Sequence, residues 1–297
     1  MASSARFSWA AGPTLRSLGH VGTARHQARL ARYAKMFGLG EKTGIEQEHE
    51  KAGIVPSSEW KRKRYNVKWH EGETLSVSIG QGYNLTTPLQ VAQATMVIAN
   101  GGTLYKPGIV EKVIDASGRE VDVFQPQVVS RLTGQGKNLK LVREGMIEAV
   151  NSRRGTGREA QIDAHGIIVG GKTGTAQVVR LAQYKHLKEE NIPYEYRDHA
   201  WFTCFAPAAN PEIVVTVIVE HGLHGGTAAA PIAAKILNRY FDDKLSGKSE
   251  GKTPPGGRSG NRVILSTEMI EDVAAPPDDD NDNGELLPLP QQIESEE

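Results

Sequence analysis

Residues 166–180 read GIIVGGKTGTAQVVR, and they combine one lysine and two threonines with four glycines. Two unrelated chemistries use a lysine and a threonine set between glycines. One binds the phosphates of a nucleotide, and the other holds a substrate carboxylate beside a serine nucleophile. The two differ in the backbone that they need, so the residues around Lys172 and Thr173 decide between them.

The phosphate interpretation has a literal match, because Gly166 is followed by four residues, 167–170, and then by the Gly171-Lys172-Thr173 triplet. A phosphate loop wraps its backbone N–H groups around the anion and starts a helix at the lysine. The intervening residues 167–169 are two isoleucines and a valine, which prefer a pleated strand. A nucleotide hydrolase that binds Mg-ATP, with Glu220 near the metal, therefore remains the weaker alternative.

The second interpretation places Lys172-Thr173-Gly174 on an edge strand that lines a cleft, and the apolar residues on both sides fit a strand. Lys172 supplies a cation, and the hydroxyls of Thr173 and Thr175 can bind a carboxylate. Glycines at 170, 171 and 174 would let a substrate backbone approach closely. In such sites a backbone N–H just after the triplet polarises the scissile carbonyl, a contribution of about 3 kcal/mol. The same triplet at residues 42–44 follows a predicted helix, and there it is expected only to end that helix.

Several elements are predicted around this strand. Thr87 is a candidate N-cap with Pro88 at the first helical position, and this helix should end at Asn100. Residues 45–72, including the basic run at 61–64, are expected to form a surface loop. The remaining predictions are a helix over 27–37, two short strands around a Ser117-Gly118 turn, a helix ending at Val150, successive strands from Ile167 to Glu220, and a closing helix after Gly226.

The composition excludes some classes of function. Lys+Arg and Asp+Glu are equal at 35 each, so no net field favours nucleic acid. The single cysteine, Cys204, excludes an internal disulfide and is expected in the sheet core with Trp201 and Phe202. No apolar run approaches the ~18 residues that span a bilayer. The arginine-rich first 40 residues imitate an organellar transit peptide, and the acidic, proline-rich end is expected to be disordered.

An ordered series of segments carries a resemblance to a known family. They are YAKMFGLGEKTGIE, GIVPSSEWKRKRY, GETLSVSIGQGYNLTTPLQVAQATMVIANGGTLYKP, GGKTGTAQVV, HAWFTCFAPA and GLHGGTAAAPIAAKIL. Together they resemble the transpeptidase domain of class B penicillin-binding proteins, in particular those of cell elongation. The resemblance implies an α+β fold of the penicillin-binding and serine β-lactamase type, an antiparallel sheet flanked by helices, incomplete at its N-terminus. It covers residues 28–242, with an unmatched segment at 1–27 and a disordered tail at 243–297.

The resemblance also implies an activity and roles for residues. The family's enzymes are D,D-transpeptidases that cross-link peptidoglycan stem peptides through a serine acyl-enzyme and are acylated by β-lactams. Lys172 would support the substrate and the proton network, Thr173 and Thr175 would bind the terminal carboxylate, Gly174 would line the substrate site, and the Thr175 amide would form half of the oxyanion hole. We expect no cofactor and no metal. Expected partners are a membrane glycan polymerase and other elongation proteins, at the periplasmic face of the bacterial inner membrane.

Two of the family's motifs, Ser-x-x-Lys and Ser-x-Asn or Ser-x-Asp, are not found where the family has them, before YAKMFGLG. Literal matches occur at Ser58–Lys61 in the predicted loop and at Ser249–Lys252 and Ser259–Asn261 in the predicted tail, and none of these is expected to be catalytic. The chain is therefore expected to be a fragment that is inactive alone. The alternative is a non-catalytic module that binds muropeptides or β-lactams.

A few polar residues lie near the motif without a clear chemical role. His221 and His224 lack a third ligand, so a loop beside the cleft is favoured over a metal site. Gln81 is expected to hold a turn. Arg153 and Arg154 are expected at the surface, with a position facing the cleft left open.

Overall fold

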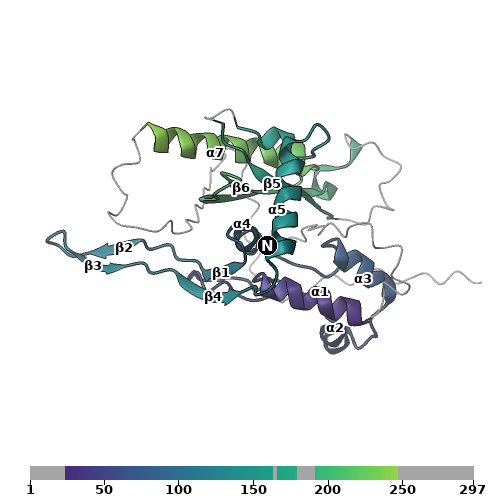
Figure 1. Ribbon diagram of the computed structural model, residues 1–297. Helices are drawn as coiled ribbons and strands as arrows, with labels where there is room; N and C mark the ends of the chain where they lie inside the picture. Colours follow the sequence, from purple (N-terminus) through teal and green to yellow (C-terminus); the bar gives the residue numbers. More distant parts are fainter. Residues whose placement is uncertain (1–23, 163–165, 179–190, 247–297) are drawn as a thin grey trace, which may run out of the picture. The chain divides into compact units, whose positions relative to one another are not determined.

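The computed structural model describes residues 24–162, 166–178 and 191–246 (Figure 1). The predicted arginine-rich N-terminus up to residue 23 and the acidic tail from residue 247 lie outside the described residues. The helices are α1 (Ala24–Met36), α2 (Ser58–Tyr65), α3 (Glu71–Ser78), α4 (Pro88–Ala99), α5 (Gly136–Asn151) and α7 (Ala230–Leu245). The strands are β1 (Thr103–Lys106), β2 (Lys112–Ile114), β3 (Glu120–Val123), β4 (Gln127–Arg131), β5 (Gly170–Ala176), β6 (His199–Ala206) and β7 (Ile213–Val219).

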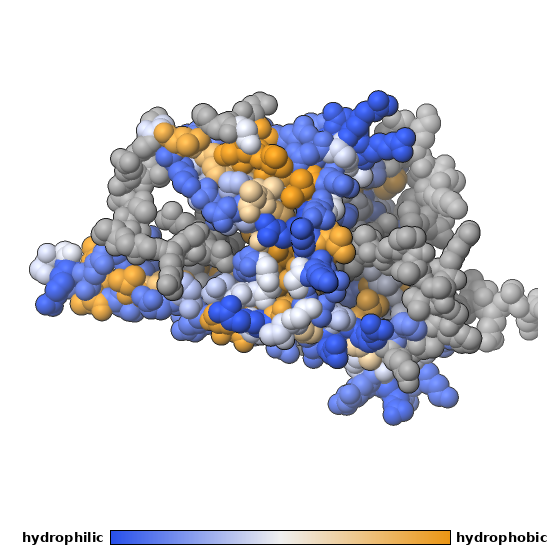
Figure 2. Space-filling view, viewed as in Figure 1, coloured by the Kyte–Doolittle hydropathy of each residue, from blue (hydrophilic) through white to orange (hydrophobic). Residues whose placement is uncertain are grey.

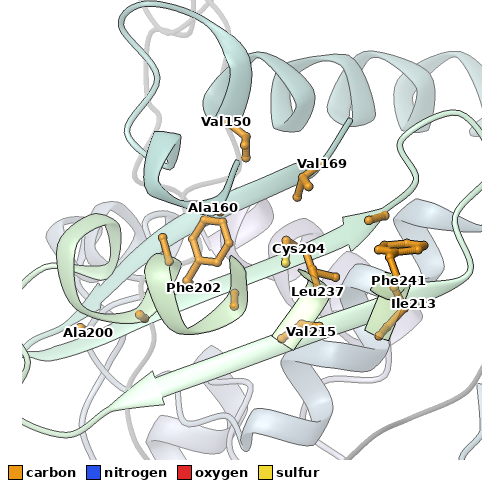
Figure 3. Packing of buried hydrophobic residues seen from close by; sticks show 14 residues of the cluster. Val150, Ala160, Val169, Ala200, Phe202, Cys204, Ile213, Val215, Leu237 and Phe241 are labelled. Atoms are coloured by element: carbon orange, nitrogen blue, oxygen red, sulfur yellow. The ribbon is translucent and has the colours of Figure 1, made fainter. Parts of the chain in front are cut away.

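The three strands β5, β6 and β7 form an antiparallel sheet in which β6 is central. Successive side chains of β6 point to opposite faces of the sheet. One face packs against α5 and α7, and Figure 3 shows Phe202, Cys204 and Leu237 gathered there. Trp201 and Phe202 are 2% and 0% exposed, so the prediction that they belong to the sheet core is confirmed. Helices on both faces of an antiparallel sheet confirm the predicted α+β class.

The other face of the sheet packs against α4, which is buried along most of its length. Thr203 of β6 lies between Thr95 of α4 and Thr216 of β7, and hydroxyl hydrogen bonds of 2.8 and 2.7 Å join the three side chains. These hydrogen bonds pair buried hydroxyl groups, which would destabilise the fold if they were left without partners. The sheet that carries the Lys172 strand is therefore fixed between two helical layers.

Helix α4 begins and ends where the sequence predicts. Thr87 accepts a hydrogen bond from the Gln90 N–H at 3.2 Å, while the Gln90 side chain accepts one from the Thr87 N–H at 3.0 Å. This reciprocal pair is a capping box, with Pro88 at the first helical position. The helix ends at Ala99, and Gly101 and Gly102 follow with positive φ.

The interpretation of residues 45–72 as a surface loop is wrong in its second half. Ser57 caps a helix over Ser58–Tyr65, and Asn66 ends it in the left-handed region. Lys61, the first residue of the basic run, is 3% exposed, and its ammonium group forms an ion pair with Glu73 of α3. The sequence did not reveal this helix because its one buried position carries a lysine, whose partner lies twelve residues away.

A two-part β-ribbon extends from the end of α4. Strand β1 pairs with β4, and β2 pairs with β3 around the predicted turn at Ser117-Gly118, where Gly118 has φ of +85°. Most of the apolar side chains on β2 and β3 are exposed, and orange patches mark this ribbon in Figure 2. The predicted pair of strands is confirmed, although the ribbon contributes little to the core.

Candidate functional site

The Lys172 triplet lies within strand β5, as the second interpretation requires. The strand runs from Gly170 to Ala176, and no helix begins at Lys172 or Thr173. This backbone rules out a phosphate loop, because its N–H groups follow a strand and do not converge on one anion. Residues 172–175 are partly exposed, so they remain accessible to a ligand.

The bounds of the strand differ from the predicted ones, since Ile167 to Val169 and Gln177 to Val178 lie outside it. Ile168 accepts a hydrogen bond from the Ala208 N–H at 2.7 Å, in the turn between β6 and β7. The glycines at the start of β5 are also required for a reason other than substrate access. A Cβ on Gly170 would lie 2.5 Å from the ring of Phe205, and one on Gly171 would lie 2.6 Å from the ring of Phe202. Packing against β6 explains these two glycines.

Strand β5 is an edge strand, paired with β6 on one side and with no described strand on the other. Thr175 lies opposite Ala200, and its carbonyl oxygen accepts a hydrogen bond from the Gln81 side chain at 3.4 Å. In an antiparallel ladder one residue directs its N–H and its C=O to the same side. The Thr175 N–H therefore also points to the open edge, where the sequence interpretation expects an oxyanion donor.

Lys172 places a cation beside this edge. Its ammonium group donates a hydrogen bond to the Thr173 carbonyl oxygen at 2.6 Å, and no carboxylate in the described part of the chain forms an ion pair with it. Burial lowers the pKa of Lys172 below its ordinary value. A partly buried cation without an anionic partner is suited to an anionic ligand.

The two threonines of the strand lie on the other side of its pleat from Lys172. Lys172 is opposite Thr203, whereas Thr173 and Thr175 are opposite Phe202 and Ala200. The hydroxyl of Thr173 forms a hydrogen bond of 2.9 Å with the hydroxyl of Thr156, a residue of the turn after α5. The sequence did not single out Thr156.

The loop between β7 and α7 lies against the same strand. It enters a single turn of wider helix, η5 (Gly225–Ala229), before α7 begins. A Cβ on Gly225 would lie 1.9 Å from the Trp201 carbonyl oxygen and 2.7 Å from that of Gly174, so the loop touches both β6 and β5. A glycine is needed at position 225 because the backbones approach so closely.

The histidines of this loop do not form a metal site with their described neighbours. The ring of His221 packs at 4.7 Å from that of His199, and the described residues contain no group of three or more histidines, cysteines, aspartates or glutamates that could hold a metal ion. The His221 backbone N–H donates to His199 Nδ1 at 2.9 Å. Arg153 and Arg154 are exposed, as predicted for surface residues.

The literal Ser-x-x-Lys match at 58–61 is on a helix and not in the predicted loop, but its lysine is engaged elsewhere. The Lys61 ammonium group is shared between Glu73 and the Lys68 carbonyl oxygen. The second Lys-Thr-Gly triplet, at 42–44, lies outside any strand, and Thr43 there hydrogen-bonds to Glu50. Within the described part of the chain, neither segment forms a hydrogen bond or an ion pair with β5.

Sequence reasoning missed two residues that contact β5, Gln81 and Thr156. Gln81 was expected only to hold a turn, yet it is 7% exposed and reaches a residue 94 positions away. Each of the two stands between glycines, Gly80-Gln81-Gly82 and Gly155-Thr156-Gly157. A polar residue between two glycines is a signal for a tight turn that presents one side chain, although it does not say to what.

Comparisons with known proteins agree on one family. The family model described as "Penicillin binding protein transpeptidase domain" matches residues 17–238 of this chain. The chain is 40% identical over 225 residues to the peptidoglycan D,D-transpeptidase MrdA of Haemophilus influenzae, covering 73% of this chain and 33% of that protein. It is similar to the crystal structure of Pseudomonas aeruginosa PBP2 in complex with WCK 5153, with a TM-score of 0.59 and 34% identity over 73% of this chain and 43% of that one. It is also similar to PBP2 in its complex with MreC from Helicobacter pylori, with a TM-score of 0.55, 32% identity, and 73% and 38% coverage.

Proposed function

Because this chain belongs to the penicillin-binding protein transpeptidase family, we propose that β5 forms one wall of a peptidoglycan D,D-transpeptidase site. The chain spans about a third of the length of the curated relative it matches. The observation that supports this function most is the open edge of β5, where the Lys172 ammonium group, the hydroxyls of Thr173 and Thr175 and the outward N–H of Thr175 lie within four residues. These groups suit a peptide that ends in a carboxylate.

In this proposal each group of β5 has one role. Lys172 attracts the terminal carboxylate of the stem peptide and supports the proton network. Thr173 and Thr175 donate hydroxyl hydrogen bonds to that carboxylate, and Gly174 lines the site between them. The Thr175 N–H donates to the oxygen of the scissile carbonyl, where a fixed donor contributes about 3 kcal/mol to the transition state.

Acyl transfer also requires a serine with an activating base. Among the described residues no serine hydroxyl hydrogen-bonds to Lys172 or to the threonines of β5. The serine of the Ser58–Lys61 match is at the start of α2, and its lysine is paired with Glu73. We therefore propose that this chain by itself binds the peptide without forming an acyl-enzyme.

Equilibrium binding tests the proposed wall. The probe is diacetyl-L-lysyl-D-alanyl-D-alanine, compared with the same peptide as its C-terminal amide. The chain should bind the acid more tightly, and Lys172→Met should reduce that preference roughly 10- to 100-fold, since a hydrogen bond to a charged group contributes about 1.5–3 kcal/mol. Lys42→Met is the matched control, because it removes the lysine of the other Lys-Thr-Gly triplet. Equal binding of acid and amide, or an equal loss in both variants, contradicts the proposal.

A fluorescent penicillin distinguishes the non-catalytic proposal from an active enzyme. We expect no covalent label on the chain after denaturing electrophoresis. If the chain is labelled, and if an excess of unlabelled penicillin blocks that labelling, the chain contains a working nucleophile. This result would refute the proposal that the chain is inactive alone. A rise in melting temperature on adding Mg-ATP would instead revive the nucleotide alternative that the strand geometry opposes.

We propose that the partners and location follow the relatives. A solved relative is a complex of PBP2 with MreC, which supports an assembly with a protein of that kind. A glycan polymerase as a second partner and the periplasmic face of the bacterial inner membrane as the location are proposed from the family resemblance alone. None of the described helices is long and apolar enough to cross a bilayer. Co-purification of the tagged chain with MreC from detergent-solubilised membranes tests the assembly, and its absence under conditions that retain a full-length relative would contradict it.

A further inference from the structure

The turn that carries Thr156 packs closely against the end of α5 and against the sheet. The Gly155 N–H donates to the Ser152 carbonyl oxygen at 3.0 Å, and the Gly157 N–H donates to that of Ala149 at 2.9 Å. A Cβ on Gly155 would lie 2.4 Å from the Ala149 carbonyl oxygen, and one on Gly157 would lie 2.9 Å from the ring of Phe202. No other residue type fits on either side of Thr156, so the end of α5 and the sheet core fix its position.

The opposite side of the turn is equally close. A Cβ on Gly226 would lie 2.3 Å from the Thr156 carbonyl oxygen and 3.7 Å from Cγ2 of Thr173. The loop before α7 therefore contacts both threonines of the hydroxyl pair. Three segments far apart in the sequence meet at this pair, which is a sign that its geometry is fixed by the fold and not by the surface rotamers of two free side chains.

The chemistry of the pair follows from a count of its protons. Each threonine hydroxyl has one hydrogen to donate and can accept two. The 2.9 Å bond between Thr156 and Thr173 uses one of the two hydrogens, and the other is free to point outward. An ionised carboxylate accepts hydrogen bonds and donates none. Thr173 can donate to such a ligand only if Thr156 is the donor within the pair.

We infer that Thr156 is a positioning residue for the carboxylate site: its hydroxyl donates to Thr173 Oγ1 and so aims the Thr173 hydrogen at the carboxylate of the peptide. The role rests on the proposed function of β5. Thr156 acts through Thr173 and does not need to touch the ligand. Removing its hydroxyl leaves Thr173 free to rotate, and the anion then loses an oriented donor.

Binding of diacetyl-L-lysyl-D-alanyl-D-alanine and its C-terminal amide to the full chain tests this inference. Thr156→Val, which keeps the shape of the side chain, should weaken binding of the acid about 5- to 10-fold and leave binding of the amide within 2-fold. Thr156→Ser, which restores a hydroxyl, should return the affinity for the acid to within 2-fold of the wild type. Thr227→Val is the matched control, because Thr227 is an exposed threonine of the neighbouring loop whose hydroxyl donates only to the His224 carbonyl oxygen.

The possible outcomes distinguish a failure of the role inferred for Thr156 from a failure of the proposed function of β5. If the wild type prefers the acid and Thr156→Val binds both peptides as the wild type does, the inference is refuted and the carboxylate site stands. An equal loss for acid and amide, without rescue by serine, also refutes it, since this is the mark of a merely structural role. If the wild type does not distinguish acid from amide, the proposed function fails, and the inference is overturned with it.

Discussion

Substitution of Gly171 by alanine separates two reasons for the glycines of β5. The added Cβ would lie 2.6 Å from Cζ of Phe202 and 3.0 Å from both the Cβ of Cys204 and the carbonyl oxygen of Thr203. Optimal carbon–carbon contacts are 3.5–4.0 Å, so the ring must move by about 1 Å. Phe202 is 0% exposed and its ring also lies close to the backbone of Gly157, so it has little space to move into.

Overpacking of this kind destabilises by roughly 1–3 kcal/mol, and the confinement of Phe202 places Gly171→Ala near the upper end. At about 2–4 °C for each kcal/mol in a domain of this size, the melting temperature should fall by roughly 5–10 °C. Urea unfolding followed by circular dichroism measures the loss. Gly145→Ala is the control, because a Cβ there meets nothing within 4 Å in the middle of α5. That change should stabilise the chain by about 0.5–1 kcal/mol.

The result that would refute the packing argument is specific. If Gly171→Ala unfolds within about 0.5 kcal/mol of the wild type yet no longer binds the peptide acid, then the glycine serves substrate access, as the sequence first indicated. If it is destabilised and the folded fraction still prefers the acid, packing alone explains it. A change in the denaturant slope would show an altered folded or unfolded state, and the two stabilities would then be compared by calorimetry.

Three further predictions concern other parts of the fold. Burial raises the pKa of the Cys204 thiol to about 12, so it should react with a disulfide reagent at pH 8 only after unfolding, and a fast reaction in the native chain would contradict this. Lys61→Met should cost about 2 kcal/mol because Glu73 loses its buried partner, whereas Lys63→Met, at an exposed ion pair, should cost under about 0.5 kcal/mol in the same urea assay. Burial, with a neighbouring imidazole, lowers the pKa of His199, so its neutral form is favoured in the folded chain. The stability that this contributes is fully present above the unfolded pKa of about 6.5, and it is lost as the pH falls from there through the lowered pKa of the folded chain. Unfolding at pH 8 and pH 5.5 should therefore show a smaller difference in His199→Gln than in the wild type.

The sequence predicted best those elements whose signals are local. Thr87, Pro88 and Gly101 mark both ends of α4 because caps act within one turn of the helix. The Ser117-Gly118 turn is likewise fixed by its own residues, and Asp115 accepts the N–H of Ser117 at 2.9 Å. The strand around Lys172 could be predicted because β-branched flanks argued against a phosphate loop.

What the sequence did not predict depends on partners far along the chain. Helix α2 has almost no apolar face, and it is held instead by Lys61, whose partner Glu73 belongs to the next helix. The role of Gly171 depends on Phe202, and the role of Gln81 on Thr175. A pattern read along one segment does not contain such pairings, so the boundaries of β5 and the supports of its open edge came only from the structure.

The open edge of β5 is selective for what it can bind. An unpaired edge strand offers both donors and acceptors and so invites a further strand. Here the carbonyl oxygens of Thr173 and Thr175 already accept hydrogen bonds, from Lys172 at 2.6 Å and from Gln81 at 3.4 Å. Within residues 172–175 the groups left to a ligand include several donors: the outward N–H of Thr175, the Lys172 ammonium group and one hydroxyl hydrogen of the pair formed by Thr156 and Thr173. Such an edge favours the carboxylate and carbonyl oxygens at the end of a peptide over a strand from another protein, which would first have to displace the Gln81 amide.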